Sequence, residues 1–326
     1  MSTLPDLPVP ADGQQPPFHH LGRPDVGHRW RPVAGIVVLL AGILLVLHGP
    51  TALLDNWPHP RRLPILGPMT DTARALAQVA LILPVVLAVT RWISGRPVGT
   101  LLSVTGRLRW RQLGVSMLIA LPTTIIVIAT AILLILATRG LPVPPPTTAG
   151  SAPAIDLGYL RQLPACLLII VALAVLQAST EELTCRGFIL QTAGGYTRSP
   201  WPGIAAQAVA FTLLHGLDGT IWGYAGLTAY ALMVGWLTVF TGGIEAAIAL
   251  HVTWNTTVLV LAGTAIVLTG ADPSQRGTME GATWQVTLAH VLGTAAYTLT
   301  VAWLTRRRTR PRPAAPAAAL APVPSS

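Results

Sequence analysis

Long runs of hydrophobic residues, separated by short polar stretches, dominate the chain. A helix of about 20 apolar residues crosses a bilayer, and runs near this length recur from end to end. The runs are continuous and lack the alternation of barrel strands, so the pattern predicts an all-α fold, a polytopic transmembrane helical bundle of about eight helices. The fifth run is short and glycines interrupt the sixth, which leaves the count open by one. The expected helices lie at 32–47, 72–89, 113–138, 164–180, 203–215, 221–240, 244–268 and 284–304.

Polar and proline-rich stretches divide the chain into five parts. We expect two disordered tails, a polar one at 1–30 and, at 306–326, one that is basic and then rich in Ala and Pro. A loop rich in Pro and Gly, 139–159, cannot cross lipid and separates two groups of helices. The N-terminal group spans 31–138, and the second group, 160–305, holds the polar clusters that lie within apolar runs.

Composition supports a membrane location. Hydrophobic residues make up 52% of the 326 residues and charged residues only 10%, whereas soluble proteins carry about 25% charged residues. The chain is therefore predicted to be an integral membrane protein. All 21 basic residues are arginine, a bias that indicates GC-rich coding and hence a bacterial plasma membrane.

The net charge of +9 is concentrated at the ends of the apolar runs. Arginines precede the first run, lie between the second and third, and follow the last. Cytoplasmic loops of membrane proteins carry an excess of basic residues, so both termini are predicted to be cytoplasmic. The anionic surface of a lipid bilayer is a sufficient partner for this charge, and no nucleic-acid partner is expected.

Ionisable and amide side chains stand in or beside three of the apolar runs. A charge in hydrocarbon is costly unless it is paired or faces water, so such residues mark a functional site. Within one bundle, three polar clusters could converge on a single site. The clusters are Glu181-Glu182 with Arg186, then Phe211 with His215, and then His251 with Asn255.

The first cluster predicts an ion pair and a second, free carboxylate. On a helix, Glu182 and Arg186 lie four residues apart and face each other, while Glu181 is rotated by about 100° from that pair. One carboxylate would be neutralised, and the other could point into a cavity. The alternative is an ordinary ion pair at a helix end near the membrane surface.

The other clusters supply neutral hydrogen-bonding groups. His251 and Asn255 lie one turn apart, an arrangement that can hold an oxyanion; the alternative is a polar contact between helices. His215 shares a helix face with Phe211, and a lone histidine on such a face is more often structural than catalytic. Glu245, at the beginning of its run, is expected to be an exposed carboxylate at the membrane surface.

The order of the motifs, EExxxR, FxxxH and HxxxN, resembles the CPBP family of intramembrane proteases. That family includes the CAAX prenyl endopeptidases and the bacteriocin-processing or immunity (Abi) proteins. The resemblance covers roughly residues 162–269 and implies that 160–305 is the catalytic core of an intramembrane endopeptidase. It implies a membrane-associated peptide or protein as the substrate, although the bacterial composition disfavours a prenylated CAAX protein.

The resemblance also implies a role for each residue. Glu181 would activate a water molecule with help from His215, and His251 and Asn255 would stabilise the tetrahedral oxyanion. The supporting residues would be Glu182, Arg186 and Phe211.

A divalent metal is a second way to activate water. Glu181, His215 and His251 form a set of the kind that binds catalytic Zn²⁺, but the sequence lacks the HExxH motif. We expect water bound by Glu181 and His215 rather than a tightly bound metal.

Two other classes of function stay open, a non-enzymatic membrane immunity or scaffold protein and a proton-coupled transporter. The absence of an internal repeat disfavours the transporter.

Helix direction raises a problem of depth. Alternating directions put Glu181 and His251 near one membrane face, whereas His215 lies about 20 Å along its helix from residue 202. Either the fourth helix continues past Glu181 toward residue 190, or the fifth helix is tilted or short.

Overall fold

The computed structural model describes residues 16–24, 26–54, 63, 65–139, 157–216, 219–269 and 282–309. These residues form helices and no strand, and their one isolated β-bridge joins Ser103 to Gly243. The all-α prediction is confirmed.

Eight helical segments follow the eight predicted runs in order. One segment is divided into α2 (Thr70–Ala80), α3 (Ile82–Ala88) and the π-helix η4 (Val89–Ile93), and another, α7 (Trp201–Leu214), is short. Seven segments in the described residues are long and apolar enough to cross a membrane, so the chain is an integral membrane protein. The remaining helices are α1 (Arg31–Leu54), α4 (Trp110–Arg139), α5 (Leu157–Glu182), α8 (Ile221–Thr241), α9 (Glu245–Thr269) and α10 (Trp284–Thr309).

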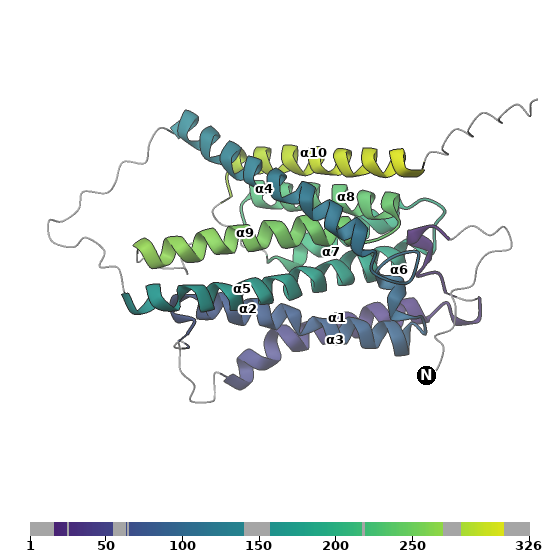
Figure 1. The fold of residues 1–326 in the computed structure, drawn as a ribbon. Helices are drawn as coiled ribbons and strands as arrows, with labels where there is room; N and C mark the ends of the chain where they lie inside the picture. Colours follow the sequence, from purple (N-terminus) through teal and green to yellow (C-terminus); the bar gives the residue numbers. More distant parts are fainter. Residues whose placement is uncertain are drawn as a thin grey trace, which may run out of the picture.

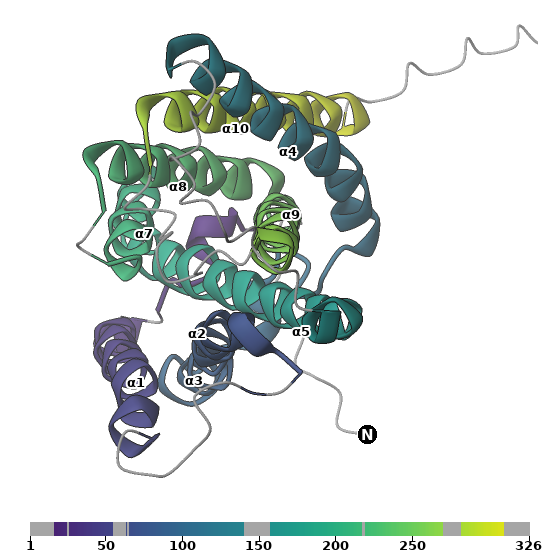
Figure 2. The ribbon, with the colours of Figure 1, turned by 90° about the vertical axis from the view of Figure 1, so that its left-hand side faces the viewer.

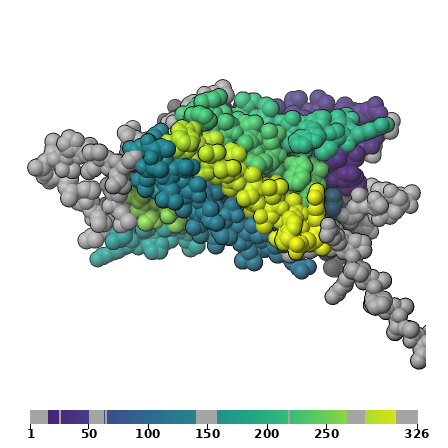
Figure 3. Space-filling model, turned by 90° about the horizontal axis from the view of Figure 1, so that it is seen from above, coloured from purple at the N-terminus to yellow at the C-terminus, as the bar shows by residue number. Residues whose placement is uncertain are grey.

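The helices lie side by side along one direction (Figure 1). Seen along that direction, α5 separates the group α1–α3 from the other helices, and α9 lies near the centre (Figure 2). Helix α9 packs against α4, α5 and α8, and a larger share of its residues is buried than of the residues of α1. Helices α4 and α10 cross on one outer face (Figure 3). The centre of the bundle is thus the interface of α5 with α9.

The fourth segment is longer than predicted, and its length removes the problem of depth. Helix α5 continues without a break into the π-helix η6 (Leu183–Leu190) and α6 (Gln191–Gly194). Glu181 therefore lies about 20 Å from the end of this segment at 1.5 Å per residue. His215 lies a similar distance along the short helix α7. Both side chains reach the same depth because the fourth helix continues past Glu181, as the first alternative required.

The predicted disordered tail at 1–30 is wrong for its described part. Residues Phe18–His20 form the short 3₁₀-helix η1, which packs against α6. Phe18 is 1% exposed among buried apolar residues that include Leu190 and Ile204, and a nitrogen of His20 donates to the carbonyl of Thr197 at 2.9 Å. Burial of Phe18 offsets the entropy that ordering this segment costs. The described ends of the predicted loop 139–159 and of the predicted tail 306–326 are helical, because α4 ends at Arg139, α5 begins at Leu157 and α10 ends at Thr309. The rest of both segments and residues 1–15 lie outside the described residues.

The prediction for Glu245 is also wrong, because its carboxylate is fully buried. Arg109 reaches it from the segment before α4. The backbone N–H and Nε of Arg109 donate to Oε1 at 2.9 and 2.8 Å, and Nη2 donates to Oε2 at 2.6 Å. Gly242 ends α8 with a φ of +70°, which lets the chain turn into α9 within three residues. A buried carboxylate needs such a partner. The sequence did not predict this ion pair, because 136 residues separate Arg109 from Glu245.

We expect Arg109→Ala to destabilise the bundle by about 3–5 kcal/mol, because it leaves the buried Glu245 carboxylate without its guanidinium. Titration of SDS into the detergent-solubilised protein would measure this change in the free energy of unfolding. The matched control is Asp71→Ala, which removes an exposed ion pair with Arg74 and should cost less than about 1 kcal/mol. Equal effects of the two substitutions would contradict the role given to the Arg109–Glu245 pair.

Candidate active site

Helices α5, α7 and α9 bring the predicted polar clusters together in the interior of the bundle. The Oε2 atom of Glu181 lies 3.6 Å from Nε2 of His251 and 4.0 Å from Nε2 of His215. The Oε1 atom of Glu182 lies 2.8 Å from Nδ1 of His251. Residues 181, 215 and 251 therefore form one site.

Glu182 is the buried support beneath this site. Its side chain and that of Arg186 are both fully buried, and Nη1 of Arg186 donates to Oε1 of Glu182 at 3.1 Å. The same oxygen accepts from Nδ1 of His251 across the α5–α9 interface. The predicted Glu182–Arg186 ion pair is present, and it lies within the bundle rather than at an exposed helix end. It also joins two helices through the imidazole.

Aromatic rings cover the guanidinium of Arg186. Its central carbon lies 4.4 Å from the ring centre of Phe211 and 5.4 Å from that of Tyr230. Contacts of this kind stabilise a cation that has lost its water. Phe211 also lies 4.6 Å from the ring of His215 and 5.8 Å from that of His251. Phe211 thus contacts the Arg186 guanidinium and lies beside both imidazoles.

Hydrogen bonds at Nδ1 fix how both imidazoles face Glu181. Nδ1 of His215 lies 2.7 Å from the carbonyl oxygen of Phe211, and since a carbonyl only accepts, this nitrogen carries a hydrogen. Nδ1 of His251 likewise donates to the Glu182 carboxylate. In a neutral ring the hydrogen on Nδ1 leaves Nε2 with a lone pair. Each histidine therefore turns its second nitrogen toward Oε2 of Glu181.

The two oxygens of Glu181 differ in their surroundings. Oε1 accepts from Nε2 of Gln177 at 2.5 Å. Oε2 is buried and has no hydrogen-bond partner among the described residues, and both imidazoles lie beyond direct hydrogen-bonding distance. A buried polar atom of this kind bonds to water or to a bound group. Oε2 is therefore the oxygen of this carboxylate that is free to bind water or another group.

The family comparison matches this part of the chain. Residues 163–257 match the model of the type II CAAX prenyl endopeptidase Rce1-like family. The segment is an Rce1-like domain. The family is one of peptidases, and the resemblance to the CPBP proteases is confirmed. No curated protein and no solved structure matched the chain.

The Rce1-like domain covers less than a third of the chain, yet it contains the whole polar site. It begins in α5 and ends in the first half of α9, immediately after Asn255. Nδ2 of Asn255 donates to Oε1 of Gln177 at 2.9 Å. Asn255 thus lies beside the site and contacts it through Gln177.

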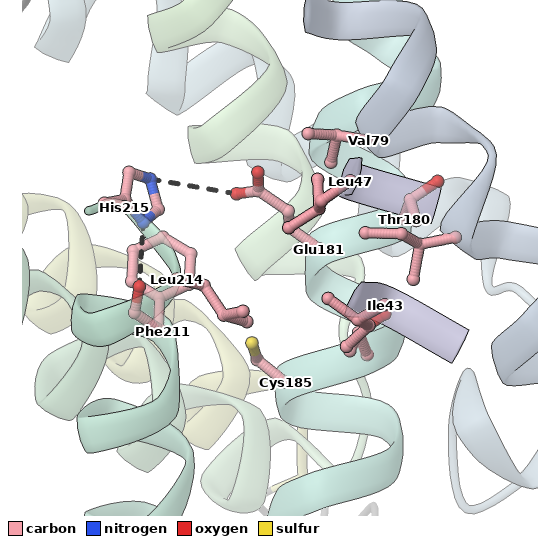
Figure 4. A pocket seen from close by; sticks show the side chains of 11 residues that line it. Ile43, Leu47, Val79, Thr180, Glu181, Cys185, Phe211, Leu214 and His215 are labelled. Atoms are coloured by element: carbon pink, nitrogen blue, oxygen red, sulfur yellow. Dashed lines mark hydrogen bonds and ion pairs between the residues drawn. The ribbon is translucent and has the colours of Figure 1, made fainter. Parts of the chain in front are cut away.

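A cavity opens on Glu181 from outside the domain. Figure 4 shows Glu181 and His215 facing each other at its edge, with apolar side chains of α1 and α2 opposite them. About 40 Å³ is open to the centres of water molecules, whereas one water needs about 10–15 Å³. Glu181 therefore lines a cavity that has room for water. The residues from outside the Rce1-like domain are Ile43, Leu47, Val79 and Ile82.

The three candidate metal ligands have suitable donor atoms at unsuitable distances. Donor atoms bound to one tetrahedral zinc lie about 3.3–3.6 Å apart, given bonds of about 2.0–2.2 Å. The distance from Oε2 of Glu181 to His251, 3.6 Å, is at the upper end of this range, and the distance to His215, 4.0 Å, exceeds it. In the part of the chain that the structure describes, no three His, Cys, Asp or Glu side chains are arranged to hold a metal ion. Glu181, His215 and His251 do not fit a zinc site as they are placed.

Two residues of the site were missed by sequence reasoning. Gln177 lies four residues before Glu181 on the same helix face, so its spacing was a signal that could have found it. Tyr230 lies in the glycine-containing helix α8, and its position over Arg186 has no sequence signal, because it depends on how α8 packs against η6 and α7.

We expect purified protein to contain less than one equivalent of zinc and a strong chelator to inhibit peptidase activity only in part. Elemental analysis of the wild type, His215→Ala and His251→Ala would test this. One zinc per chain in the wild type that is lost in both variants would contradict the expectation.

Proposed function

We propose that this protein is an intramembrane endopeptidase that hydrolyses a peptide bond of a membrane-associated protein or peptide. One observation carries the proposal: two imidazole Nε2 atoms converge on the unpartnered, buried Oε2 atom of Glu181. Membership of the segment in a peptidase family supports the reaction type.

In the proposed mechanism, Glu181 and His215 hold a water molecule between Oε2 and Nε2. Glu181 accepts a proton from this water as the hydroxide oxygen attacks the substrate carbonyl carbon. The gap of 4.0 Å is too long for a direct hydrogen bond and is typical of groups that share a water. Glu181 then returns the proton to the leaving amine, and the peptide bond breaks.

The negative charge that forms on the carbonyl oxygen needs hydrogen-bond donors. We assign this role to His251 and Asn255. When His251 carries a hydrogen on each nitrogen, Nδ1 donates to Glu182 and Nε2 is available to the oxyanion. Nδ2 of Asn255 uses one hydrogen for Gln177 and keeps a second. Loss of one such donor typically costs about 100- to 1000-fold in kcat.

The support residues keep this geometry without touching the substrate. Glu182 orients His251, Arg186 neutralises Glu182, and Phe211 packs against Arg186 and both imidazoles. A side chain held by several fixed contacts loses little entropy when the substrate binds, which favours reaction.

The cavity indicates the chemical class of the substrate. Its lining from α1, α2 and α3 is aliphatic, and its polar groups lie at the Glu181 end. We propose that an apolar portion of the substrate lies against these helices while a backbone carbonyl faces Glu181. The beginning of α1 and the end of α10 lie at the same end of the bundle (Figure 1). Because arginines are concentrated there, we place that end and both termini in the cytoplasm.

Substitution of Glu181→Gln, His215→Ala or His251→Ala should abolish cleavage of a reporter peptide by folded protein in detergent. Each change removes the water-activating or oxyanion-binding group. The controls make the same kinds of substitution outside the site: Asp71→Asn removes a carboxylate and His28→Ala removes an exposed imidazole. Both variants should cleave normally. Full turnover by Glu181→Gln would show that this carboxylate is not the base. A phenotype in cells that survives the paired change of Glu181 and His215 would favour the immunity or scaffold function.

Filling the cavity should block the substrate without altering the polar site. We expect Val79→Trp to lower kcat/KM by about 10-fold or more, because the larger side chain occupies the apolar part of the cavity. Leu81→Trp, two residues further on and 53% exposed, is the matched control. Equal activity of the two variants would contradict the proposed position of the substrate.

A further inference from the structure

Gln177 connects two residues of the site that do not contact each other. It lies one turn before Glu181 on α5 and is 7% exposed. Its Nε2 donates to Oε1 of Glu181 at 2.5 Å, and its Oε1 accepts from Nδ2 of Asn255 at 2.9 Å. The chain of hydrogen bonds therefore runs from Asn255 on α9, through Gln177, to the carboxylate on α5.

The chemistry of the groups allows one orientation of the Gln177 amide. An ionised carboxylate only accepts hydrogen bonds, so the NH₂ group of Gln177 must face Glu181. Its carbonyl oxygen then faces Asn255, which must present its own NH₂ group. Both amides are consequently oriented, and the hydrogen bond from Asn255 holds the carbonyl oxygen of Gln177 in place.

The hydrogen bond from Gln177 gives the two Glu181 oxygens different roles. With Oε1 held, the carboxylate cannot rotate about its terminal bond without losing a buried hydrogen bond, which costs about 1–3 kcal/mol. Oε2 remains directed at Nε2 of His215 and of His251. A carboxylate free to rotate would spend part of its time with neither oxygen placed to accept a proton from the water.

We propose that Gln177 is a positioning residue for Glu181, and that Asn255 acts on the carboxylate through Gln177 in addition to its contact with the oxyanion. This inference rests on the proposed function and specifies how its general base is held. It also gives Asn255 a second role that substitution of Asn255 alone cannot separate from the first.

The test is a double-mutant cycle on Gln177→Met and Asn255→Ala. Methionine keeps the length and approximate volume of glutamine and removes both hydrogen-bonding groups. We expect Gln177→Met to lower kcat by about 10- to 100-fold with little change in KM, because substrate contacts remain while the base is misplaced. Gln162→Met, an exposed position on the same helix, is the matched control and should cleave normally.

Coupling between the two positions distinguishes the roles of Asn255. If Asn255 acts partly through Gln177, Asn255→Ala should cost at least 3-fold less in the Gln177→Met background than in the wild type. Independent, multiplying losses would overturn the connection, and full kcat in Gln177→Met would overturn the positioning role. A thermal midpoint of Gln177→Met that matches the wild type separates misplacement of the base from loss of fold.

Failure of this inference can be told apart from failure of the proposed function. If Glu181→Gln is inactive while Gln177→Met is fully active, Glu181 remains the base and only the role of Gln177 is wrong. If Glu181→Gln is fully active, Glu181 is not the base and the proposed mechanism fails. If the wild type itself cleaves no peptide, the proposed function fails.

Discussion

The centre of the bundle depends on the hydrogen bonds that the Glu182 carboxylate accepts. This carboxylate is fully buried, and one of its oxygens accepts from both Arg186 and His251. Removal of one partner from such a buried pair costs about 3–5 kcal/mol, so the contact constrains α5 and α9 strongly. The same hydrogen bond sets the orientation of the His251 ring. Packing of the bundle and geometry of the site are therefore determined by one group, and a change that disturbs either will disturb both.

Constraints outside the Rce1-like domain complete the site. Part of the apolar lining of the cavity comes from α1, α2 and α3, which precede the domain in the chain. Arg109, also outside it, binds the buried Glu245 at the beginning of α9, six residues before His251. The position of His251 along the membrane normal thus depends on a loop that belongs to no catalytic motif. The Rce1-like segment holds the polar groups of the site, and the N-terminal helices add apolar side chains to the cavity beside them.

Sequence alone predicted the helices well because each apolar run is a local property of the chain. The pairing of Glu182 with Arg186 was also local, since i,i+4 spacing places the two side chains on one face. The ion pair of Glu245 with Arg109 was not predictable in this way, because 136 residues separate the partners. Phe18 was assigned to a disordered tail for the same reason: its burial depends on α6 and α7. Convergence of Glu181, His215 and His251 was expected from motif order, but their distances depend on how the helices pack and on the length of the fourth segment.

Quantitative peptidomics can test whether this protein hydrolyses peptide bonds in the membrane by means of Glu181. The samples are membranes from cells that carry either the wild type or Glu181→Ala at matched protein levels. We expect a defined set of membrane-associated peptides with new termini in the wild type, each replaced by its uncleaved precursor in the variant. Identical peptide termini in the two membranes would contradict this expectation.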